Sequence, residues 1–337
     1  MRGPTTAVAV ARTNRRLADQ RNAISLGILW AVLAIGVYVT YRMLDIADLS
    51  CEGVFPLGAA ITARVLSENG DPIVACLLSI AGGGIAGAVT GIMHTRLKIP
   101  ILLAGILSMT GLYSVNLRVL GKANISLLRI PTLYSKFQDA FGLRADVATF
   151  FVGLIAVALI IAVLWWFFNT ELGYSLRATG NNVHMIRAMG VDTDSMFMIG
   201  LVISNALIGL AGSLIAQKQS FADIGMGTGT IVIALASVII GEVLFGRNTV
   251  LRHMISVFLG SIVYRIIISL ILEIDFSVSL FGVSFDIAVE PTDLKLFTAI
   301  LVAAALSLPV LSKRIQARKA LTTRNEAKKE GPANAGN

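Results

Sequence analysis

The stretch "FFVGLIAVALIIAVLWWFFNTELGYSLRATGNNVHMIRAMGVDTDS" (residues 150–195) decides the fold class of this chain. Its first part, 150–168, is apolar throughout and close to the roughly 20 residues that a helix needs to cross hydrocarbon. A polar block, 171–195, separates it from a second apolar run, "MFMIGLVISNALIGLAGSLIA" (196–216). Both runs are continuous rather than alternating, which disfavours a membrane β-barrel. The pattern indicates a polytopic α-helical membrane protein.

The composition of the whole chain agrees with this class. Of 337 residues, 55% are hydrophobic and 14% are charged, and the mean hydropathy is +0.79. Soluble domains carry about 25% charged residues. We therefore expect an all-α transmembrane helical bundle with about eight or nine membrane segments, at 24–44, 53–66, 72–93, 99–118, 147–168, 196–216, 229–246, 250–272 and 294–311. The segment 53–66 is too short for a full crossing and contains Pro56, so we expect it to be broken or partial.

Three regions follow from the distribution of charge. A basic N-terminal arm (1–22) precedes a transmembrane domain (23–312), and a basic, polar tail (313–337) is expected to be disordered near anionic headgroups. The net charge of +8 falls mostly in the tails and short connections, as the positive-inside rule predicts, so no nucleic-acid partner is expected. The two cysteines, Cys51 and Cys76, lack the spacing of metal ligands.

Orientation can be tested against the same charges. Placing the block 171–195 in the cytoplasm also brings "HTRLK" (94–98), "GRNTVLRH" (246–253) and the C-terminal tail to that side. Two regions do not fit: the connection 119–147 carries basic residues on the outer side, and the basic N-terminus falls outside unless 53–66 is re-entrant. The side of the N-terminus stays open at this point.

Two segments of the chain weakly resemble each other. In both "YRMLDIADLSCEGVFPLGAAITARVL" (41–66) and "AQKQSFADIGMGTGTIVIALASVIIGEVL" (216–244), a helix end leads through an Ala-Asp and Gly element into a short apolar segment. Internal repeats with interrupted helices often bracket a transport pathway. The chain could thus contain two similar halves, or the two turns could resemble each other by chance.

The polar block predicts a short surface helix. Gly180, Asn181 and Asn182 are turn residues, and Asn is a favoured N-cap. Val183, Ile186 and Met189 are apolar and lie three residues apart, and Gly190 stands where helices commonly end. Such a helix could dock a partner or simply rest on lipid headgroups.

Polar residues inside the apolar segments are candidates for the lining of a path. A charge in hydrocarbon usually faces protein or water, whereas membrane Asn often only bonds a neighbouring helix. Arg265 could pair structurally or touch a substrate. The path candidates are Glu52, Asn116, Asn205, Gln219, Asp223 and Glu242.

Small residues form a stripe in "AGGGIAGAVTG" (81–91), where Gly83, Gly87 and Gly91 recur every four residues. This spacing lets two helices approach closely. We expect the stripe to pack against another helix, either within the subunit or in a second copy of the chain.

Several sites are missing from the sequence. The three histidines, His94, His184 and His253, do not cluster by spacing, so no metal site is expected. There is no nucleophile elbow, no His-Glu-x-x-His helix and no phosphate-binding loop. We therefore expect neither an enzyme nor an ATP site in this chain.

Long, ordered motifs resemble a known family. They are "DLSCEGVFPLGAA" (48–60), "TGIMHTRLKIPILLAGILSMTGLYSVNLRVLGKANISLL" (90–128), "LGYSLRATGNNVHMIRAMGV" (172–191) and the segment 216–242. The chain resembles permease subunits of ABC importers of the branched-chain amino acid and sugar permease superfamily. Within it, the chain is most similar to the group paired with a lipoprotein-type substrate-binding protein, which includes tryptophan- and tyrosine-type importers. Ser220 and Ala234 depart from the glycines expected there, which weakens inference about the substrate.

The resemblance implies a partnership. The chain would form a homodimer, or pair with a similar permease, in the bacterial inner membrane, with a cytoplasmic C-terminus and a path for a small organic solute such as an amino acid. A separate ATPase, carrying ATP and Mg, would dock on the cytoplasmic coupling helix, and an extracytoplasmic protein would deliver the solute. The coupling residues would be Arg177, Gly180, Asn181, Asn182, His184, Ile186, Met189 and Gly190. The alternative is a secondary transporter driven by an ion gradient. The similarity between segments 41–66 and 216–244, and the position of Glu242 in an apolar segment, would support it.

Overall fold

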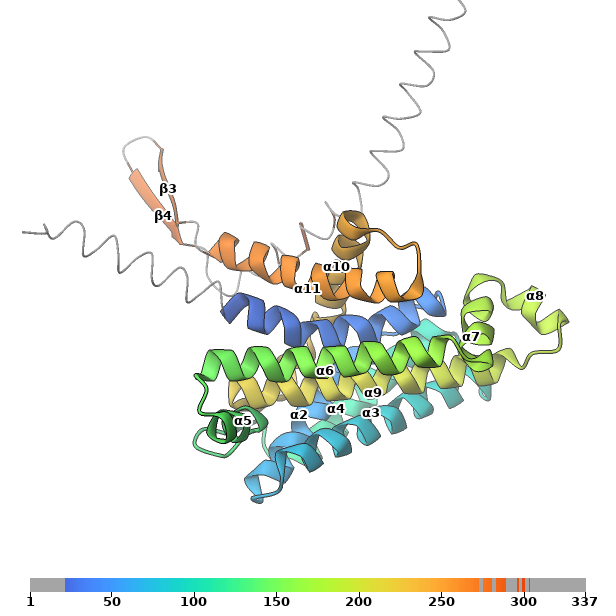
Figure 1. Ribbon diagram of the computed structural model, residues 1–337, viewed down its shortest axis with the longest axis horizontal. Helices are drawn as coiled ribbons and strands as arrows, with labels where there is room; N and C mark the ends of the chain where they lie inside the picture. The colour runs from blue at the N-terminus through green and yellow to red at the C-terminus, as the bar shows by residue number, and fades with distance from the viewer. Residues whose placement is uncertain are drawn as a thin grey trace, which may run out of the picture.

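The computed structural model describes residues 22–272, 275–280 and 283–288, with isolated positions at 296, 299, 300 and 303. Within these residues, seven helices are long and apolar enough to cross a membrane, and Figure 1 shows most of them running side by side. The protein is a helical, multi-pass integral membrane protein. The seven are the first span (Asn22–Met43), α3 (Pro72–Thr95), α4 (Ile101–Leu120), α6 (Ala145–Phe168), α9 (Thr193–Gln219), Ile224–Phe245 with α10 (Thr230–Phe245), and α11 (Val250–Leu272).

The short segment that the sequence places at 53–66 is α2 (Cys51–Ser67), a helix of 17 residues. At 1.5 Å per residue it is about 25 Å long, less than the hydrocarbon thickness of about 30 Å. It begins inside the bundle, because the Ser50 hydroxyl donates to Asn205 Oδ1 in the interior of α9 over 3.2 Å. The length of α2 therefore agrees with the expectation of a segment too short for a full crossing. The count of eight or nine segments is not established, since 294–311 lies almost entirely outside the described residues.

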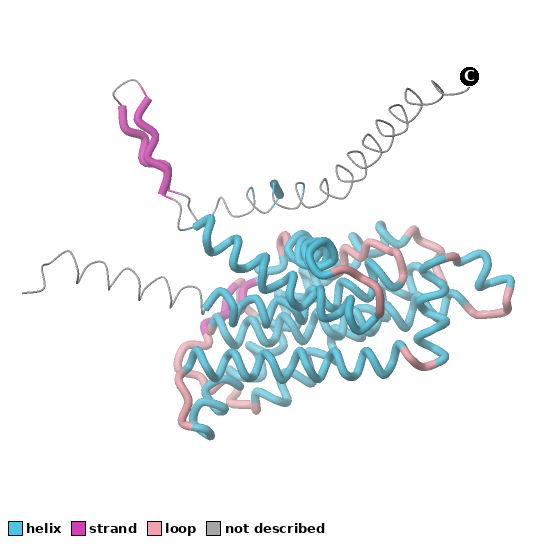
Figure 2. Tube along the Cα trace, turned by 45° about the horizontal axis from the view of Figure 1, so that its top comes forward, coloured by secondary structure: helices cyan, strands magenta, loops and turns pink. Residues whose placement is uncertain are grey.

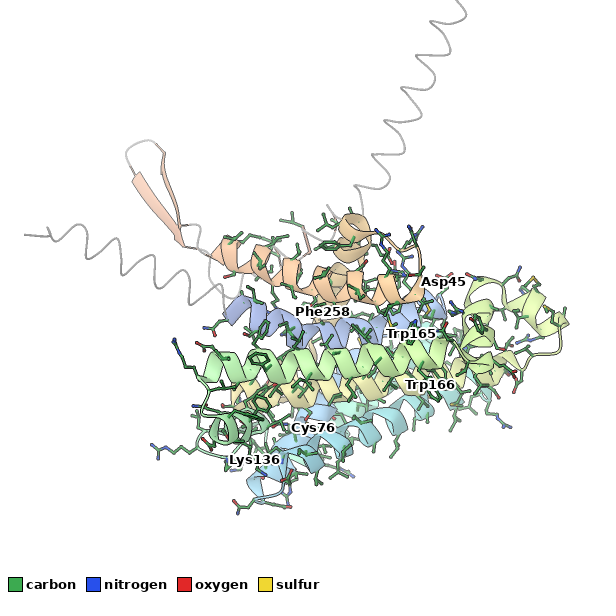
Figure 3. The ribbon with its side chains drawn as sticks, in the orientation of Figure 1. Asp45, Cys76, Lys136, Trp165, Trp166 and Phe258 are labelled. Atoms are coloured by element: carbon green, nitrogen blue, oxygen red, sulfur yellow. The ribbon has the colours of Figure 1, made fainter. Side chains whose placement is uncertain are left out.

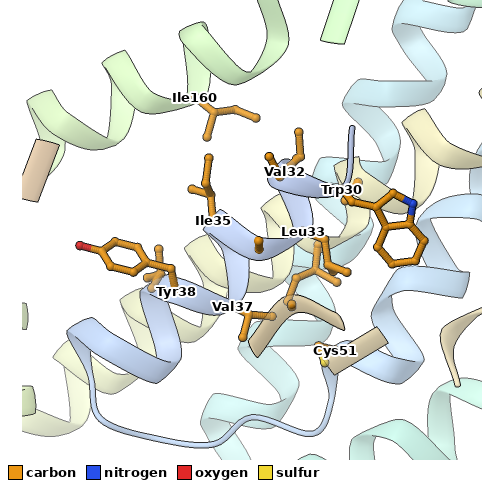
Figure 4. Packing of buried hydrophobic residues seen from close by; sticks show 14 of the residues in the cluster. Trp30, Val32, Leu33, Ile35, Val37, Tyr38, Cys51 and Ile160 are labelled. Atoms are coloured by element: carbon orange, nitrogen blue, oxygen red, sulfur yellow. The ribbon is translucent and has the colours of Figure 1, made fainter. Parts of the chain in front are cut away.

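The core surrounds the first span, which is α-helical to Tyr38 and π-helical in η1 (Val39–Met43). In its apolar window 89% of the residues are buried, against 39% in α3, which is almost as apolar. Trp30 of this span stacks on Phe55 of α2 at 5.5 Å between ring centroids, and Figure 4 shows the neighbouring side chains. Burial, and not hydropathy, therefore separates the central helix from those at the rim.

Close contacts between α2, α3 and α9 depend on small residues. A Cβ added to Gly83 of α3 would lie 2.2 Å from the Asn205 carbonyl oxygen, and one on Gly87 would lie 2.4 Å from that of Leu201. A Cβ on Gly91 would meet Met198 Sδ at 2.6 Å. The glycine stripe therefore packs against α9 of the same chain, which decides between the two alternatives that the sequence left open.

Large apolar side chains cover the outside of the bundle. Ile155, Leu159 and Val163 on α6 are 56%, 65% and 54% exposed. In a membrane protein such a face lies against lipid, where exposed apolar area carries no penalty. Trp165 and Trp166 lie near one end of α6, where interfacial aromatic residues are expected (Figure 3).

The fold is mostly helical, as expected, and it also contains two short strand pairs that were not expected. Strands β1 (Asn124–Ser126) and β2 (Phe221–Asp223) pair antiparallel, and β3 (Asp275–Leu280) pairs with β4 (Val283–Ala288) as a hairpin (Figure 2). A short helix, α5 (Leu133–Phe141), also lies in the connection 119–147. The first pair is too short for periodicity to reveal it. The arm, apart from residue 22, and the tail lie outside the described residues.

The bundle has two ends, here named after the short helices that lie there. At one end are α7 (Glu171–Asn181) and α8 (Val183–Ala188), and at the other is α5 (Figure 1). Ile24, near the start of the first span, lines a cavity together with Arg144, which precedes α6 at the α5 end. The first span therefore begins at the α5 end and finishes at the α7–α8 end.

Candidate functional site

The polar block that follows α6 forms two short helices. Asn182 caps α8, because its Oδ1 accepts the Met185 backbone N–H over 3.0 Å, and Gly190 has a φ of +87° just beyond its end. The predicted helix with Asn at its start and Gly at its end is present. Arg177, Gly180 and Asn181 belong to a separate helix, α7, whose own cap is Thr170.

Helix α7 is packed tightly against the end of the first span. A Cβ on Gly180 would lie 2.1 Å from the Met43 carbonyl oxygen, so the two backbones touch directly. Leu176 is fully buried beneath the helix. A displacement of α7 must therefore displace η1, since packed interiors transmit strain.

Helix α8 projects beyond the bundle and exposes methionines. Met185 and Met189 are 52% and 71% exposed, while Ile186 is 5% exposed and anchors the helix. The prediction that Met189 shares the apolar face of Ile186 was wrong, because the helix ends at Ala188 and Met189 is its C-cap. Exposed methionines suit an adaptable contact with another protein.

A second feature is a pocket of about 370 Å³ between α2, α4 and η2 (Ile224–Gly227). It brings together two predicted path residues, Glu52 and Asn116, which are far apart in the sequence. The other lining residues are Gly53, Pro56, Met109, Thr110, Tyr113, Ile224, Gly225 and Thr228.

The polar groups of this pocket are mainly hydrogen-bond acceptors. Glu52 Oε1 accepts the Gly229 backbone N–H over 2.9 Å. Pro56 has no N–H, so the Glu52 carbonyl lacks its usual helical partner. Asn116 Nδ2 donates to the Gly53 carbonyl over 3.0 Å, whereas Asn116 Oδ1 is buried and has no partner among the described residues. A carboxylate and a free amide oxygen favour a ligand that donates hydrogen bonds, such as an ammonium group.

The other predicted path residues lie elsewhere. Asn205 Nδ2 donates to Asp48 Oδ2 over 2.8 Å and so holds the connection before α2. Gln219 is exposed at the last position of α9, and Asp223 accepts the Gly225 backbone N–H beside the pocket over 2.7 Å. Glu242 lies at the α7–α8 end. The six candidates therefore do not form one lining, because each was chosen for its type without knowledge of its depth.

Glu242 is part of an ion-pair network. Arg42 of η1 donates two hydrogen bonds to its carboxylate, and His253 Nε2 lies 2.7 Å from Glu242 Oε1. The network joins the first span, α10 and α11 next to α7. Hydropathy does not reveal it, because Arg42 and Glu242 are 200 residues apart.

Met109 and Tyr113 line the pocket but were not among the predicted path residues, although the sequence holds a signal for them. They precede Asn116 by seven and three residues, which places all three on one face of α4. Gln217, and not Gln219, is the buried glutamine of α9; its Oε1 accepts the Leu133 backbone N–H over 2.8 Å. No local signal distinguishes these two glutamines.

The comparison with known proteins now identifies the family. Residues 21–307 match the family described as the permease component of the branched-chain amino acid transport system. The chain belongs to this permease family. The resemblance that the motifs indicated is confirmed, and the protein is a permease of this family.

Relatives span most of this permease. It is 38% identical over 286 residues to a tyrosine transport system permease protein of Clostridioides difficile (strain R20291), covering 85% of this chain and 90% of that protein. It is 33% identical over 290 residues to an uncharacterized protein of Rickettsia prowazekii (strain Madrid E), covering 85% and 95%. An autoinducer 2 import system permease protein of Yersinia pseudotuberculosis is 29% identical over 238 residues, covering 68% and 64%. No solved structure matches the chain.

Proposed function

We propose that this permease is the membrane subunit of an ATP-driven importer for an amino acid. The observation that carries the proposal is the α7–α8 pair: it exposes Met185 and Met189 at its tip and touches the first span at Gly180. A separate ATPase, which holds ATP and Mg, docks on this tip. An extracytoplasmic binding protein delivers the solute, and a second copy of the chain completes the transporter.

The packing supports a route from the tip to the bundle. Movement of α7 displaces η1 through the contact between Gly180 and Met43, and Arg42 of η1 carries it to Glu242 of α10. ATP-bound and ATP-free ATPases bind the tip differently, and only such a difference in affinity can shift the permease between two states.

The central pocket supports an amino-acid substrate. The Glu52 carboxylate and Asn116 Oδ1 accept hydrogen bonds from an ammonium group, while Met109 and Tyr113 offer apolar surface to a side chain. The tyrosine transport permease among the relatives favours the same class of solute.

Charge supports a cytoplasmic α7–α8 end in a bacterial inner membrane. Arg96, Lys98, Arg187 and Arg247 all lie in connections or short helices at this end, as the positive-inside rule predicts for the cytoplasmic side. The basic C-terminal tail is assigned to the cytoplasm by the same rule.

The secondary transporter is no longer supported by Glu242. That carboxylate already pairs with Arg42 and His253, so its charge is compensated without a transported cation. Proteoliposomes that contain the permease, its ATPase and its binding protein should transport amino acid only when ATP is supplied on the side of the membrane where the ATPase lies. Uptake driven by an ion gradient without the ATPase would contradict the proposal.

Docking can be tested separately. Met185→Glu and Met189→Glu should abolish co-purification of the ATPase, because each places a charge in an apolar contact. Phe141→Glu is the matched control, since Phe141 is 65% exposed but lies in α5 at the opposite end. Retention of the ATPase by both methionine variants would show that it docks elsewhere.

A further inference from the structure

A polar pocket of about 430 Å³ opens at the α7–α8 end. It lies between the end of the first span, α7 and the connection from α10 to α11, and it is separate from the pocket that contains Glu52. Its volume falls within the range of about 300–1,000 Å³ typical of small-molecule sites. Its polar lining residues include Tyr38, Arg42, Arg177, Asn181, Arg247 and His253.

The lining carries an excess of positive charge. Arg42 is neutralised by Glu242, which also bonds His253. Arg177 stacks over the Tyr174 ring at 4.7 Å, and neither it nor Arg247 pairs with a carboxylate within the part of the chain that the structure describes. Two cations with no counter-charge thus face the same cavity.

Two hydrogen-bond donors of the lining are unsatisfied. Tyr38 is 0% exposed, yet its hydroxyl has no partner among the described residues, and the same holds for the buried Arg177 Nε. In Figure 4 the Tyr38 hydroxyl points away from the apolar cluster around Val32 and Leu33. Buried polar groups normally have partners, so the missing partner is an acceptor that the described part of the chain does not supply.

The position of the pocket favours phosphate as that acceptor. Trp165 and Trp166 are exposed at the same end of the bundle, the depth at which interfacial aromatic residues meet headgroups (Figure 3). Arginine presents several donors in a fork that matches the oxygens of phosphate. Basic pockets between membrane helices bind phosphate headgroups.

We propose that this pocket binds a phosphate-bearing anion, either the headgroup of an anionic phospholipid or a free phosphate compound. Arg177, Arg247 and the Tyr38 hydroxyl hold it. Arg177 belongs to α7 and Arg247 to the connection after α10. The bound anion therefore links α7 to this connection, next to the ion pairs of Glu242. This binding does not depend on which solute the permease transports.

The test uses the purified full chain in detergent and two probes: inorganic phosphate and a short-chain phosphatidylglycerol. Thermal stability is measured against the concentration of each probe. We expect saturable stabilisation of the native chain. Affinity should fall at least about tenfold in Arg177→Gln/Arg247→Gln and measurably in Tyr38→Phe, since a hydrogen bond to a charged group contributes this much or more.

Arg96→Gln is the matched control, because Arg96 is an exposed arginine at the same end that does not line the pocket. Its affinity should equal that of the native chain. Stabilisation by phosphatidylglycerol alone would identify a headgroup, and stabilisation by inorganic phosphate would identify a free anion. If neither probe stabilises the native chain, or if Arg177→Gln/Arg247→Gln binds as tightly as the native chain, the proposal is wrong.

Discussion

The carboxylate of Glu52 accepts a hydrogen bond from the backbone N–H of Gly229 over 2.9 Å, and this contact joins the start of α2 to the start of α10. Both helices begin inside the bundle, each after a long span and an irregular connection. A carboxylate at a helix N-terminus is stabilised by the free N–H groups there. The two segments that resemble each other in the sequence, 41–66 and 216–244, thus meet at the pocket.

Glu52→Gln should impair transport without unfolding the permease. The amide oxygen can still accept the Gly229 N–H, but the charge that we assign to an ammonium group is lost. We expect amino-acid uptake to fall about tenfold or more, as measured in proteoliposomes. Glu68→Gln is the control, because the Glu68 side chain is 61% exposed and forms an exposed ion pair with Arg64. Equal uptake by the Glu52 and Glu68 variants would remove Glu52 from the path.

Gly83 and Gly84 offer a matched test of helix packing. A Cβ on Gly83 would lie 2.2 Å from a backbone oxygen of α9, whereas one on Gly84 would have its nearest neighbour at 3.7 Å. Gly83→Ala should lower the free energy of unfolding by about 2–4 kcal/mol. Gly84→Ala should be neutral or stabilise by up to about 1 kcal/mol through helix propensity. Unfolding in detergent measures both, and similar values would contradict the packing.

Gly180→Leu should separate docking from coupling. The methionine tip remains, so the ATPase should still co-purify, but the close contact between α7 and Met43 cannot form. We expect solute-stimulated ATP hydrolysis to fall at least about tenfold, the effect of one lost contact of about 1.4 kcal/mol. Gly111→Ala, which meets nothing within 4 Å, should behave as the native chain. Normal stimulation in Gly180→Leu would place the coupling route elsewhere.

The ion pair between Arg42 and Glu242 should contribute to stability. Their side chains are 28% and 9% exposed, so water screens the pair only in part. Arg42→Gln or Glu242→Gln should each cost roughly 1–3 kcal/mol, because the remaining charge loses its partner. The double variant should cost less than the sum, which unfolding measurements on all four forms would reveal. The exposed Arg64–Glu68 pair should yield a coupling energy below about 1 kcal/mol.

The α5 end should loosen at low pH. The hydrogen bond from Lys136 lowers the pKa of the Asp71 carboxyl below its usual 3.8. A carboxyl whose pKa is lower in the folded state stabilises the fold above the unfolded pKa, and this contribution is lost as the pH falls through the folded value. The protection of the α5 amides, measured relative to their intrinsic exchange rate at each pH, should therefore fall below about pH 4. Lys136→Gln should lower this protection above that pH and remove the pH dependence of the protection.

Local patterns determined the spans and the short surface helix. Hydropathy is a property of consecutive residues, so the runs around 72–93, 147–168 and 250–272 already locate α3, α6 and α11 to within a few residues. The same holds for α8, because a cap such as Asn182 and a stop such as Gly190 act within one turn of helix. The family motifs are also local, and the comparisons confirmed the family.

Only the tertiary structure decided which polar residues meet. Glu52 and Asn116 share a pocket, Glu242 pairs with Arg42, and Asn205 supports Asp48, yet no spacing in the sequence relates the members of any pair. The strands β1 and β2 were also invisible, since each is three residues long. Sequence fixes each residue's type and helical face, whereas depth and neighbours follow from how separate helices pack, which is a property of the whole chain.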